Sequence, residues 1–222
     1  MVGEREVVKY FAIGDVHGCL SHLMRMMEVL KPELVPERDT LVFLGDYVDR
    51  GPDPRGVVDY VLELRRELPH VVCLKGNHEA MLLDWVLNGA HYDLYLYNGG
   101  GTTIRSYSTE GSFLLPPDHL RFFKELCLCY ETDQYIFVHA GVREGRALSD
   151  QEPFDVLWIR DEFIHAAHGL NKVVIFGHTP YHEPFVAPDK IGIDTGAVYG
   201  GTLTCLELPA VRFYRVGPQD LP

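Results

Sequence analysis

Short apolar runs followed by helical spacing recur three times in the first half of the chain. The runs at residues 7–13, 40–44 and 71–74 predict β-strands. After each run a short polar loop leads into apolar residues at helical spacing, which predict helices over 20–30, 55–68 and 80–87. Three successive strand–loop–helix units imply right-handed crossovers and a parallel sheet covered by helices. The three loops are therefore expected along one edge of that sheet.

The second half of the chain is richer in strands. A helix is expected over 118–128, and strands are expected over 135–138, 172–176, 190–193, 202–208 and 211–216. A parallel first half and a strand-rich second half predict an α/β protein of two mixed β-sheets packed face to face, a β-sandwich flanked by helices. No linker or low-complexity segment interrupts the sequence, so residues 1–222 are expected to form a single domain.

The segment 90–117 lacks clear periodicity and is aromatic and glycine-rich. A loop of this composition near the loop-bearing edge of the sheet suggests a lid over a substrate. An accessory helix and turn packed on the core is an equal alternative. Gly99–Thr103 is not a P-loop, because no Gly-Lys-Ser/Thr follows a spaced glycine.

Composition and charge narrow the class of protein. The 222 residues are 46% hydrophobic and 23% charged, which is ordinary for a globular domain. The net charge of −12 disfavours both nucleic acid and anionic membranes as partners. The five cysteines are scattered, and residues 1–6 lack the pattern of a signal peptide, so a cytoplasmic location is expected. No apolar run reaches the ~20 residues that cross a bilayer.

Five of the predicted strands end in polar loops beside glycine or other small residues, where open α/β sheets place their chemistry. These loops carry Asp15, His17, Asp46, Asp49, Arg50, Asn77, His78, Glu79, His139 and His178. A metal site built from three of these imidazoles, two of these carboxylates and the amide oxygen of Asn77 contains no thiolate. Such a set of ligands suits Mn²⁺, Fe, Zn²⁺ or Co²⁺ better than Ca²⁺ or Mg²⁺. Six donors are too many for one open site and fit two ions, which can clamp an in-line displacement at phosphorus.

Taken singly, each of these features has a structural interpretation. The turn at 46–50 could be a surface turn with an internal ion pair. Glu79 could orient a neighbour or simply favour the first turn of the following helix. His165 and His168 have the spacing of a metal pair, but no strand-end motif accompanies them, so surface positions are expected. The order of five such loops along the chain is what favours a site.

The loops resemble the signature blocks of the phosphoprotein phosphatase family, which belongs to the calcineurin-like metallophosphoesterases. The matching blocks are Gly14-Asp15-Val16-His17-Gly18, Gly45-Asp46-Tyr47-Val48-Asp49-Arg50-Gly51, Gly76-Asn77-His78-Glu79, His139-Ala140-Gly141 and Gly177-His178-Thr179-Pro180. The block Trp158-Ile159-Arg160-Asp161-Glu162-Phe163 resembles the one that supplies a second phosphate-binding arginine. The compact length, with Asn98-Gly99-Gly100 and Ile193-Asp194-Thr195-Gly196, resembles the bacterial and phage lambda phosphatase-like branch.

The resemblance implies a metallophosphoesterase fold and a role for each matched residue. Six residues would hold two divalent metal ions, most readily Mn²⁺, with Fe or Zn²⁺ as alternatives. Asp15 and His17 would bind the first ion, and Asn77, His139 and His178 would bind the second. Asp46 would bind both ions. Four residues would serve the reaction itself. Arg50 and Arg160 would bind the phosphate oxygens, His78 would be the general acid, and Asp49 would orient His78. Asp49 is expected to raise the pKa of His78 and to fix its tautomer.

The implied activity is that of a metal-dependent serine/threonine protein phosphatase, a phosphoric monoester hydrolase in which a hydroxide bridging two metals attacks phosphorus directly. A phosphoprotein or phosphopeptide is the expected substrate, with small phosphate esters as further substrates. The same blocks also resemble those of symmetrical diadenosine tetraphosphate hydrolases, which cleave a phosphoanhydride, and this remains the alternative. A non-catalytic phosphate-binding protein is disfavoured because neither a metal ligand nor the acid is missing.

Overall fold

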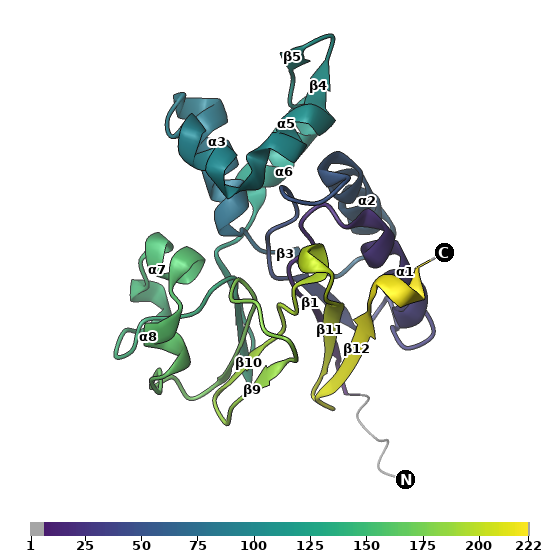
Figure 1. Cartoon of the computed structure of the whole chain (residues 1–222). Helices are drawn as coiled ribbons and strands as arrows, with labels where there is room; N and C mark the ends of the chain where they lie inside the picture. Colours follow the sequence, from purple (N-terminus) through teal and green to yellow (C-terminus); the bar gives the residue numbers. More distant parts are fainter. Residues whose placement is uncertain (1–6, 222) are drawn as a thin grey trace.

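Two five-stranded sheets form the centre of the structure, a computed structural model that describes residues 7–221 (Figure 1). Three strands of the first sheet are parallel: β1 (Tyr10–Ile13), β2 (Thr40–Phe43) and β3 (Val71–Cys73). Two antiparallel strands extend it beyond β1: β11 (Leu203–Leu208) and β12 (Arg212–Val216). The order is β12-β11-β1-β2-β3, so the C-terminal strands return to the sheet that the N-terminal half begins.

The second sheet also has three parallel strands at its centre. These are β7 (Tyr135–Val138), β8 (Val173–Phe176) and β10 (Lys190–Gly192). Its edges are the antiparallel strands β6 (Cys129–Glu131) and β9 (Phe185–Val186). The expected α/β fold of two packed mixed sheets flanked by helices is therefore confirmed.

Successive residues of the central strands face different layers of the core. In β1, Ala12 points into the space between the sheets, where it meets Phe137 and Ile175 of the second sheet. Its neighbours Phe11 and Ile13 point to the opposite face, which the helices cover. Because both faces are covered, these strands are continuous apolar runs and lack polar alternation. Each large side chain buried in this way contributes ~1.5–3 kcal/mol.

Helices cover both outer faces of the sandwich. The outer face of the first sheet packs against α1 (Leu20–Leu30) and α2 (Pro54–Glu67), whose buried residues recur at helical spacing. The outer face of the second sheet packs against α7 (Pro153–Trp158) and α8 (Asp161–Ile164). Three short helical turns complete the chain: η2 (Leu148–Asp150), η3 (Ala197–Tyr199) and η4 (Pro218–Asp220).

The remaining helices form a lobe above the strand ends, drawn in teal in Figure 1. It consists of α3 (Asn77–Asn88), α4 (Tyr92–Tyr95), the π-helical turn η1 (Leu96–Gly100), α5 (Gly101–Tyr107), and α6 (Pro117–Glu125). A two-stranded hairpin, β4 (Ser108–Thr109) and β5 (Ser112–Phe113), projects from this lobe. The segment 90–117 is thus helical through most of its length.

Several boundaries differ from the sequence prediction, each for a local reason. The first strand begins at Tyr10 and not at Val7, because Tyr10 is the first residue with partners on both neighbouring strands. Helix α3 begins at Asn77 and not at Ala80, because the Glu79 carboxylate accepts from the Gly76 N–H and caps the helix there. Helix α6 ends at Glu125, since the following residues pair with the chain after β3.

Several short elements had no sequence prediction: the strands β4, β5, β6 and β9, the helices α7 and α8, and the turns η2, η3 and η4. Residues 1–6, which are expected to carry no signal peptide, lie outside the described part of the chain. Within residues 7–221, no helix has the length and apolar character needed to cross a membrane.

The inter-sheet layer should dominate the stability of the fold. Phe137→Ala is expected to lower the free energy of unfolding by ~3–5 kcal/mol, because it removes a fully buried ring between the sheets. Phe154→Ala is the matched control: this ring is 70% exposed, and its loss should change the free energy by less than ~0.5 kcal/mol. Urea unfolding followed by circular dichroism measures both, and equal losses would contradict the layer assignment.

Candidate metal and phosphate site

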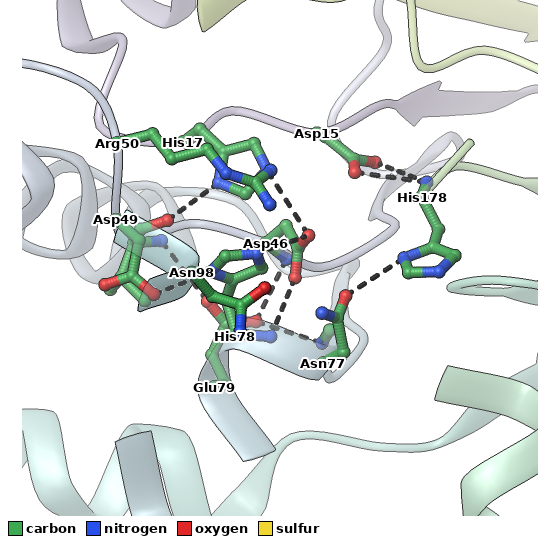
Figure 2. Close-up of polar contacts among 12 residues, drawn as sticks. Asp15, His17, Asp46, Asp49, Arg50, Asn77, His78, Glu79, Asn98 and His178 are labelled. Atoms are coloured by element: carbon green, nitrogen blue, oxygen red, sulfur yellow. Dashed lines mark hydrogen bonds and ion pairs between the residues drawn. The ribbon is translucent and has the colours of Figure 1, made fainter. Parts of the chain in front are cut away.

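Six parallel strands, three from each sheet, end at the same side of the sandwich. The loops after β1, β2, β3, β7 and β8 carry all the strand-end residues singled out by sequence, and the loop after α7 adds Arg160. Hydrogen bonds and close polar contacts connect the ten candidate residues into one cluster, most of which Figure 2 shows. The structure therefore brings together residues that lie up to 163 positions apart in the sequence, from Asp15 to His178.

Four of these side chains converge on one point. Asn77 Oδ1 lies 2.9 Å from His139 Nε2 and 3.0 Å from His178 Nδ1. Asp46 Oδ1 lies 3.5 Å from the same His139 nitrogen. His139 Nδ1 lies 2.9 Å from the Leu44 carbonyl and donates to it. In the neutral ring Nε2 then carries a lone pair, which faces the oxygens of Asn77 and Asp46. Lone pairs that face one another in a buried site call for a cation between them.

A second group forms on the other oxygen of Asp46. His17 Nε2 lies 3.3 Å from Asp46 Oδ2, and its Nδ1 donates to the Val48 carbonyl at 2.9 Å. Arg50 Nη1 lies 2.6 Å from the same His17 Nε2. The two carboxylate oxygens of Asp46 thus face separate groups of nitrogen donors, as a bridging ligand would. The Asp15 carboxylate lies against His178 of the first group, whose backbone N–H donates to both of its oxygens at 3.1 Å.

The electrostatics of the cluster fit divalent metal ions. Burial lowers the pKa of His17 well below its usual value and that of His139 to about 3, so these imidazoles are neutral and able to bind metal. Burial, with the charges of neighbouring carboxylates, raises the pKa of Asp15 and of Asp46 well above their usual range. The positive charge of Arg50 opposes this rise in the pKa of both acids without cancelling it, so the two buried carboxylates would be stabilised by further positive charge. Donors of mixed nitrogen and oxygen type around them fit two divalent ions.

The pair formed by Asp49 and His78 lies next to the metal cluster. Asp49 Oδ2 is 2.6 Å from His78 Nδ1, and both side chains are fully buried. His78 Nε2, on the opposite side of the ring, has no hydrogen-bond partner, and it lies 4.0 Å from Asp46 Oδ2. A buried nitrogen without a partner is costly unless a group outside the protein supplies one.

The expected effect of Asp49 on the pKa of His78 is wrong for the protein alone. Burial, followed by the positive charge of Arg50, lowers the pKa of His78 well below its usual value. Burial also raises the pKa of Asp49 to about 7, so the carboxylate that was expected to favour imidazolium is itself hard to ionise. Asp49 Oδ2 does contact His78 at Nδ1, and the expected effect on the tautomer stays a prediction.

Glu79 holds the loop that carries Asp46. Its carboxylate is fully buried and accepts hydrogen bonds from the backbone N–H groups of Asp46 (2.9 Å), Tyr47 (2.9 Å), Val48 (3.2 Å) and Gly76 (2.9 Å). Burial raises its pKa to about 7 against the opposing effect of these donors. Gly76 is required in this arrangement, because a Cβ there would lie 2.0 Å from Asp46 Oδ1. Of the two interpretations left open by sequence, the structure supports the one in which Glu79 orients a neighbour.

Backbone strain is concentrated in the same loops. Five of the ten candidate residues have positive φ angles: His17 (45°), Asp46 (52°), Asp49 (71°), Arg50 (64°) and His178 (63°). A non-glycine residue in this region costs of order 1–3 kcal/mol and persists only where its surroundings fix it. The chain therefore holds these side chains in orientations that an unstrained loop would not give.

The two arginines differ from the ligands in their exposure. Arg160 is exposed, and its Nε donates to His178 Nε2 at 3.1 Å. Arg50 is half-buried beside His17. Their guanidinium groups flank the cluster on the sides of His17 and His178, as expected for groups that bind an anion above the metals.

The sequence missed three buried residues of the site. Tyr95 and Thr103, from the segment 90–117, donate to Asp49 Oδ1 at 2.7 and 2.5 Å. Asp194, which follows β10, is the largest neighbouring charge that raises the pKa of Asp15. The strand-end position of Asp194 was a usable signal.

His168 was expected at the surface, which is wrong: it is 1% exposed and bonded to the Asp189 carbonyl and the Leu170 N–H.

Comparison with known proteins identifies the family. The profile of the calcineurin-like phosphoesterases matches residues 8–208. The chain belongs to this family. The membership expected from the signature blocks is confirmed, and the match covers both sheets from β1 to the end of β11.

Individual relatives carry two different names. Serine/threonine-protein phosphatase 1 of Salmonella typhimurium is 33% identical over 204 residues, which are 87% of this chain and 89% of that protein. The asymmetrical bis(5'-nucleosyl)-tetraphosphatase PrpE of Bacillus cereus is 28% identical over 241 residues, which cover 97% of this chain and 96% of that protein. The crystal structure of a candidate diadenosine tetraphosphatase superposes with a TM-score of 0.75 at 23% identity, covering 96% and 95%. At 23% identity, the similarity to this crystal structure concerns the fold alone.

The role of Glu79 can be tested through stability and metal binding together. Glu79→Gln places an amide NH₂ among N–H donors, and we expect the free energy of unfolding to fall by about 1–3 kcal/mol. Because the Asp46 loop loses its support, Mn²⁺ affinity should also fall by ~10–100-fold. Glu63→Gln, on the exposed side of α2, is the control and should change neither. Urea unfolding and isothermal titration calorimetry measure the two effects; unchanged metal affinity in Glu79→Gln would refute the coupling.

Proposed function

We propose that the protein is a metal-dependent phosphatase that hydrolyses phosphoserine and phosphothreonine esters in proteins or peptides. The observation that supports this most is the unpartnered, buried Nε2 of His78, whose ring Asp49 holds from the other side. An alkoxide is a poor leaving group, so a phosphate monoester of serine or threonine gains most from a positioned proton donor. Small phosphate esters are further substrates.

Each side chain of the site has a defined task in this proposal. Arg50 and Arg160 bind the equatorial phosphate oxygens, where charge builds up during in-line attack. With the negative charge of the phosphate beside it, His78 carries a proton on both ring nitrogens; it delivers the Nε2 proton to the leaving oxygen, and Asp49 keeps the ring in place for that transfer. When bound, two divalent ions supply Lewis-acid charge to the phosphate and lower the pKa of water for its attack. The buried walls of the cluster keep bulk water away from the leaving group.

We propose Mn²⁺ as the metal, with Fe or Zn²⁺ as alternatives. Asp15 and His17 hold one ion, Asn77, His139 and His178 hold the other, and Asp46 is shared. The absence of a thiolate from this set supports a borderline-to-hard ion. We also propose a cytoplasmic location, which is supported by the five free cysteines of the structure.

A second candidate is hydrolysis of dinucleoside tetraphosphates, expected from sequence in its symmetrical form. The name of the Bacillus relative favours it. So does Tyr199, which is 64% exposed and whose ring centroid lies 5.7 Å from the Arg50 guanidinium carbon. A nucleobase could stack on that ring while Arg50 binds the adjoining phosphate.

The two candidates are separated by assaying purified protein with Mn²⁺ on both substrates. We expect a phosphoserine peptide to be hydrolysed with the larger kcat/KM, and chelation of the metal to abolish turnover. Diadenosine tetraphosphate should be cleaved more slowly, and chromatography of its products distinguishes two ADP from ATP plus AMP. Fast cleavage of the dinucleotide beside an inert phosphopeptide would overturn the first proposal in favour of the second.

The acid role of His78 gives a separate prediction. His78→Asn should lower kcat on the phosphoserine peptide by ~10²–10⁴-fold and lower kcat on p-nitrophenyl phosphate much less, because p-nitrophenolate leaves without a proton. His182→Asn, at a side chain that is 98% exposed, is the control and should match the wild type. Calorimetric titration with Mn²⁺ verifies that the metal is still bound. Equal turnover of both substrates by His78→Asn and wild type would show that His78 is not the acid.

A further inference from the structure

The two oxygens of the Asp49 carboxylate have different partners. Oδ2 contacts His78, while Oδ1 accepts from the hydroxyls of Tyr95, at 2.7 Å, and Thr103, at 2.5 Å. Thr103 Oγ1 also accepts from the backbone N–H of Asp49 at 2.9 Å. Both hydroxyl-bearing residues are fully buried. Asp49 is therefore fixed in three directions by groups from the segment 90–107.

The same segment supports the strained backbone on either side of this carboxylate. Asp49 and Arg50 are consecutive residues with positive φ. The Arg50 N–H donates to the carbonyl of Gly99 at 3.2 Å, beside the bond from Asp49 to Thr103. Gly99, at φ 102°, permits this approach, because a Cβ there would lie 2.7 Å from Arg50 Cγ. The loop conformation thus depends on α5 and on η1, where the chain is kinked at Gly99.

The Tyr95 hydroxyl is itself held rigidly. Its ring stacks on Trp85 of α3, with centroids 5.6 Å apart and planes 24° from parallel. On its other side the ring lies against Gly100, where a Cβ would come within 2.5 Å of Tyr95 Cε1. A lid has to move to admit substrate, whereas Tyr95, Gly100 and Thr103 are buried. The lid interpretation of 90–117 does not fit these three positions.

We propose that Tyr95 and Thr103 are positioning residues that act through Asp49 to orient His78 for proton transfer. The inference rests on the proposed acid role of His78. With both hydroxyls on Oδ1, the carboxylate cannot rotate about its Cβ–Cγ bond, so Oδ2 stays directed at Nδ1 and Nε2 stays directed at the leaving oxygen. Without them the carboxylate is free to turn, and the ring loses its orientation.

Two variants remove one hydroxyl each and retain the shape of the side chain: Tyr95→Phe and Thr103→Val. We expect each to lower kcat on a phosphoserine peptide about tenfold, the size of one lost hydrogen bond to a charged group, with KM unchanged. On p-nitrophenyl phosphate the loss should stay below about twofold, since that leaving group needs no proton. Thr103→Ser retains the hydroxyl and should restore wild-type kcat.

Tyr107→Phe is the matched control. It also removes a buried tyrosine hydroxyl from α5, but that hydroxyl bonds to His119 at 2.8 Å and not to Asp49. It should leave the ratio of the two kcat values unchanged. Equal losses on both substrates in Tyr95→Phe and Thr103→Val would mean that the hydroxyls serve only stability, and would overturn the proposal.

A readout that does not depend on turnover separates this proposal from the proposed function. In ¹⁵N-histidine-labelled protein, the Nδ1 proton of His78 should give a downfield resonance that shifts in Tyr95→Phe and Thr103→Val and not in Tyr107→Phe. If the wild type hydrolyses neither substrate, the proposed function fails while the resonance still decides the positioning role. An unchanged resonance in both variants refutes that role.

Discussion

The central constraint on this structure is the removal of four carboxylates from water at one edge of the sandwich. Asp15, Asp46, Asp49 and Glu79 are each 4% exposed or less. An ionised carboxylate in such a place is unstable unless hydrogen bonds or positive charge stabilise it. Glu79 and Asp49 have those partners within the protein, from four backbone N–H groups and from two hydroxyls and an imidazole. Asp15 and Asp46 each accept from a single backbone N–H, that of His178 and of His78, and this smaller number of partners supports the proposal that they are the metal ligands among the four acids.

The architecture supplies this cluster from both sheets. Asp46 belongs to the first sheet and His139 and His178 belong to the second, so an ion held by all three would join the two layers. The inter-sheet core, with Phe137 between the strands, fixes the distance between those layers. A change in the packing of the core would therefore move the ligands of one sheet relative to those of the other. The inter-sheet core that stabilises the fold would therefore also set the distance between the candidate metal ligands of the two sheets.

Local patterns in the sequence were sufficient for the strands, for the loops at their ends and for the family. Apolar runs buried on both faces and the polar residues after them are features of neighbouring positions, which a sequence displays directly. Contacts across the fold are different. Tyr95 and Thr103 lie 46 and 54 positions from Asp49, and nothing in their own neighbourhood marks them. The positive φ of Asp46 and Asp49 is likewise set by partners elsewhere, such as Glu79 and Thr103.

His168 illustrates the same limit for burial. Its neighbours in sequence are small and polar, which is typical of a surface turn, yet Phe163 and the Asp189 carbonyl enclose it. Glu79 is the intermediate case, because its position at the start of a helix was visible while its partners across the β2 loop were not.

The arrangement around Asp49 also bears on substrate chemistry. A phosphoanhydride expels a phosphate group, which leaves readily without protonation, whereas a serine or threonine ester expels an alkoxide. The signature blocks also resemble those of hydrolases that cleave an anhydride, so the acid does not exclude that substrate; an anhydride gains less from the acid than an ester does. Here one carboxylate, two hydroxyls, a strained two-residue turn and the kink at Gly99 all bear on the orientation of His78. So much structure directed at a proton donor is most useful for the ester, where the departing oxygen requires the proton.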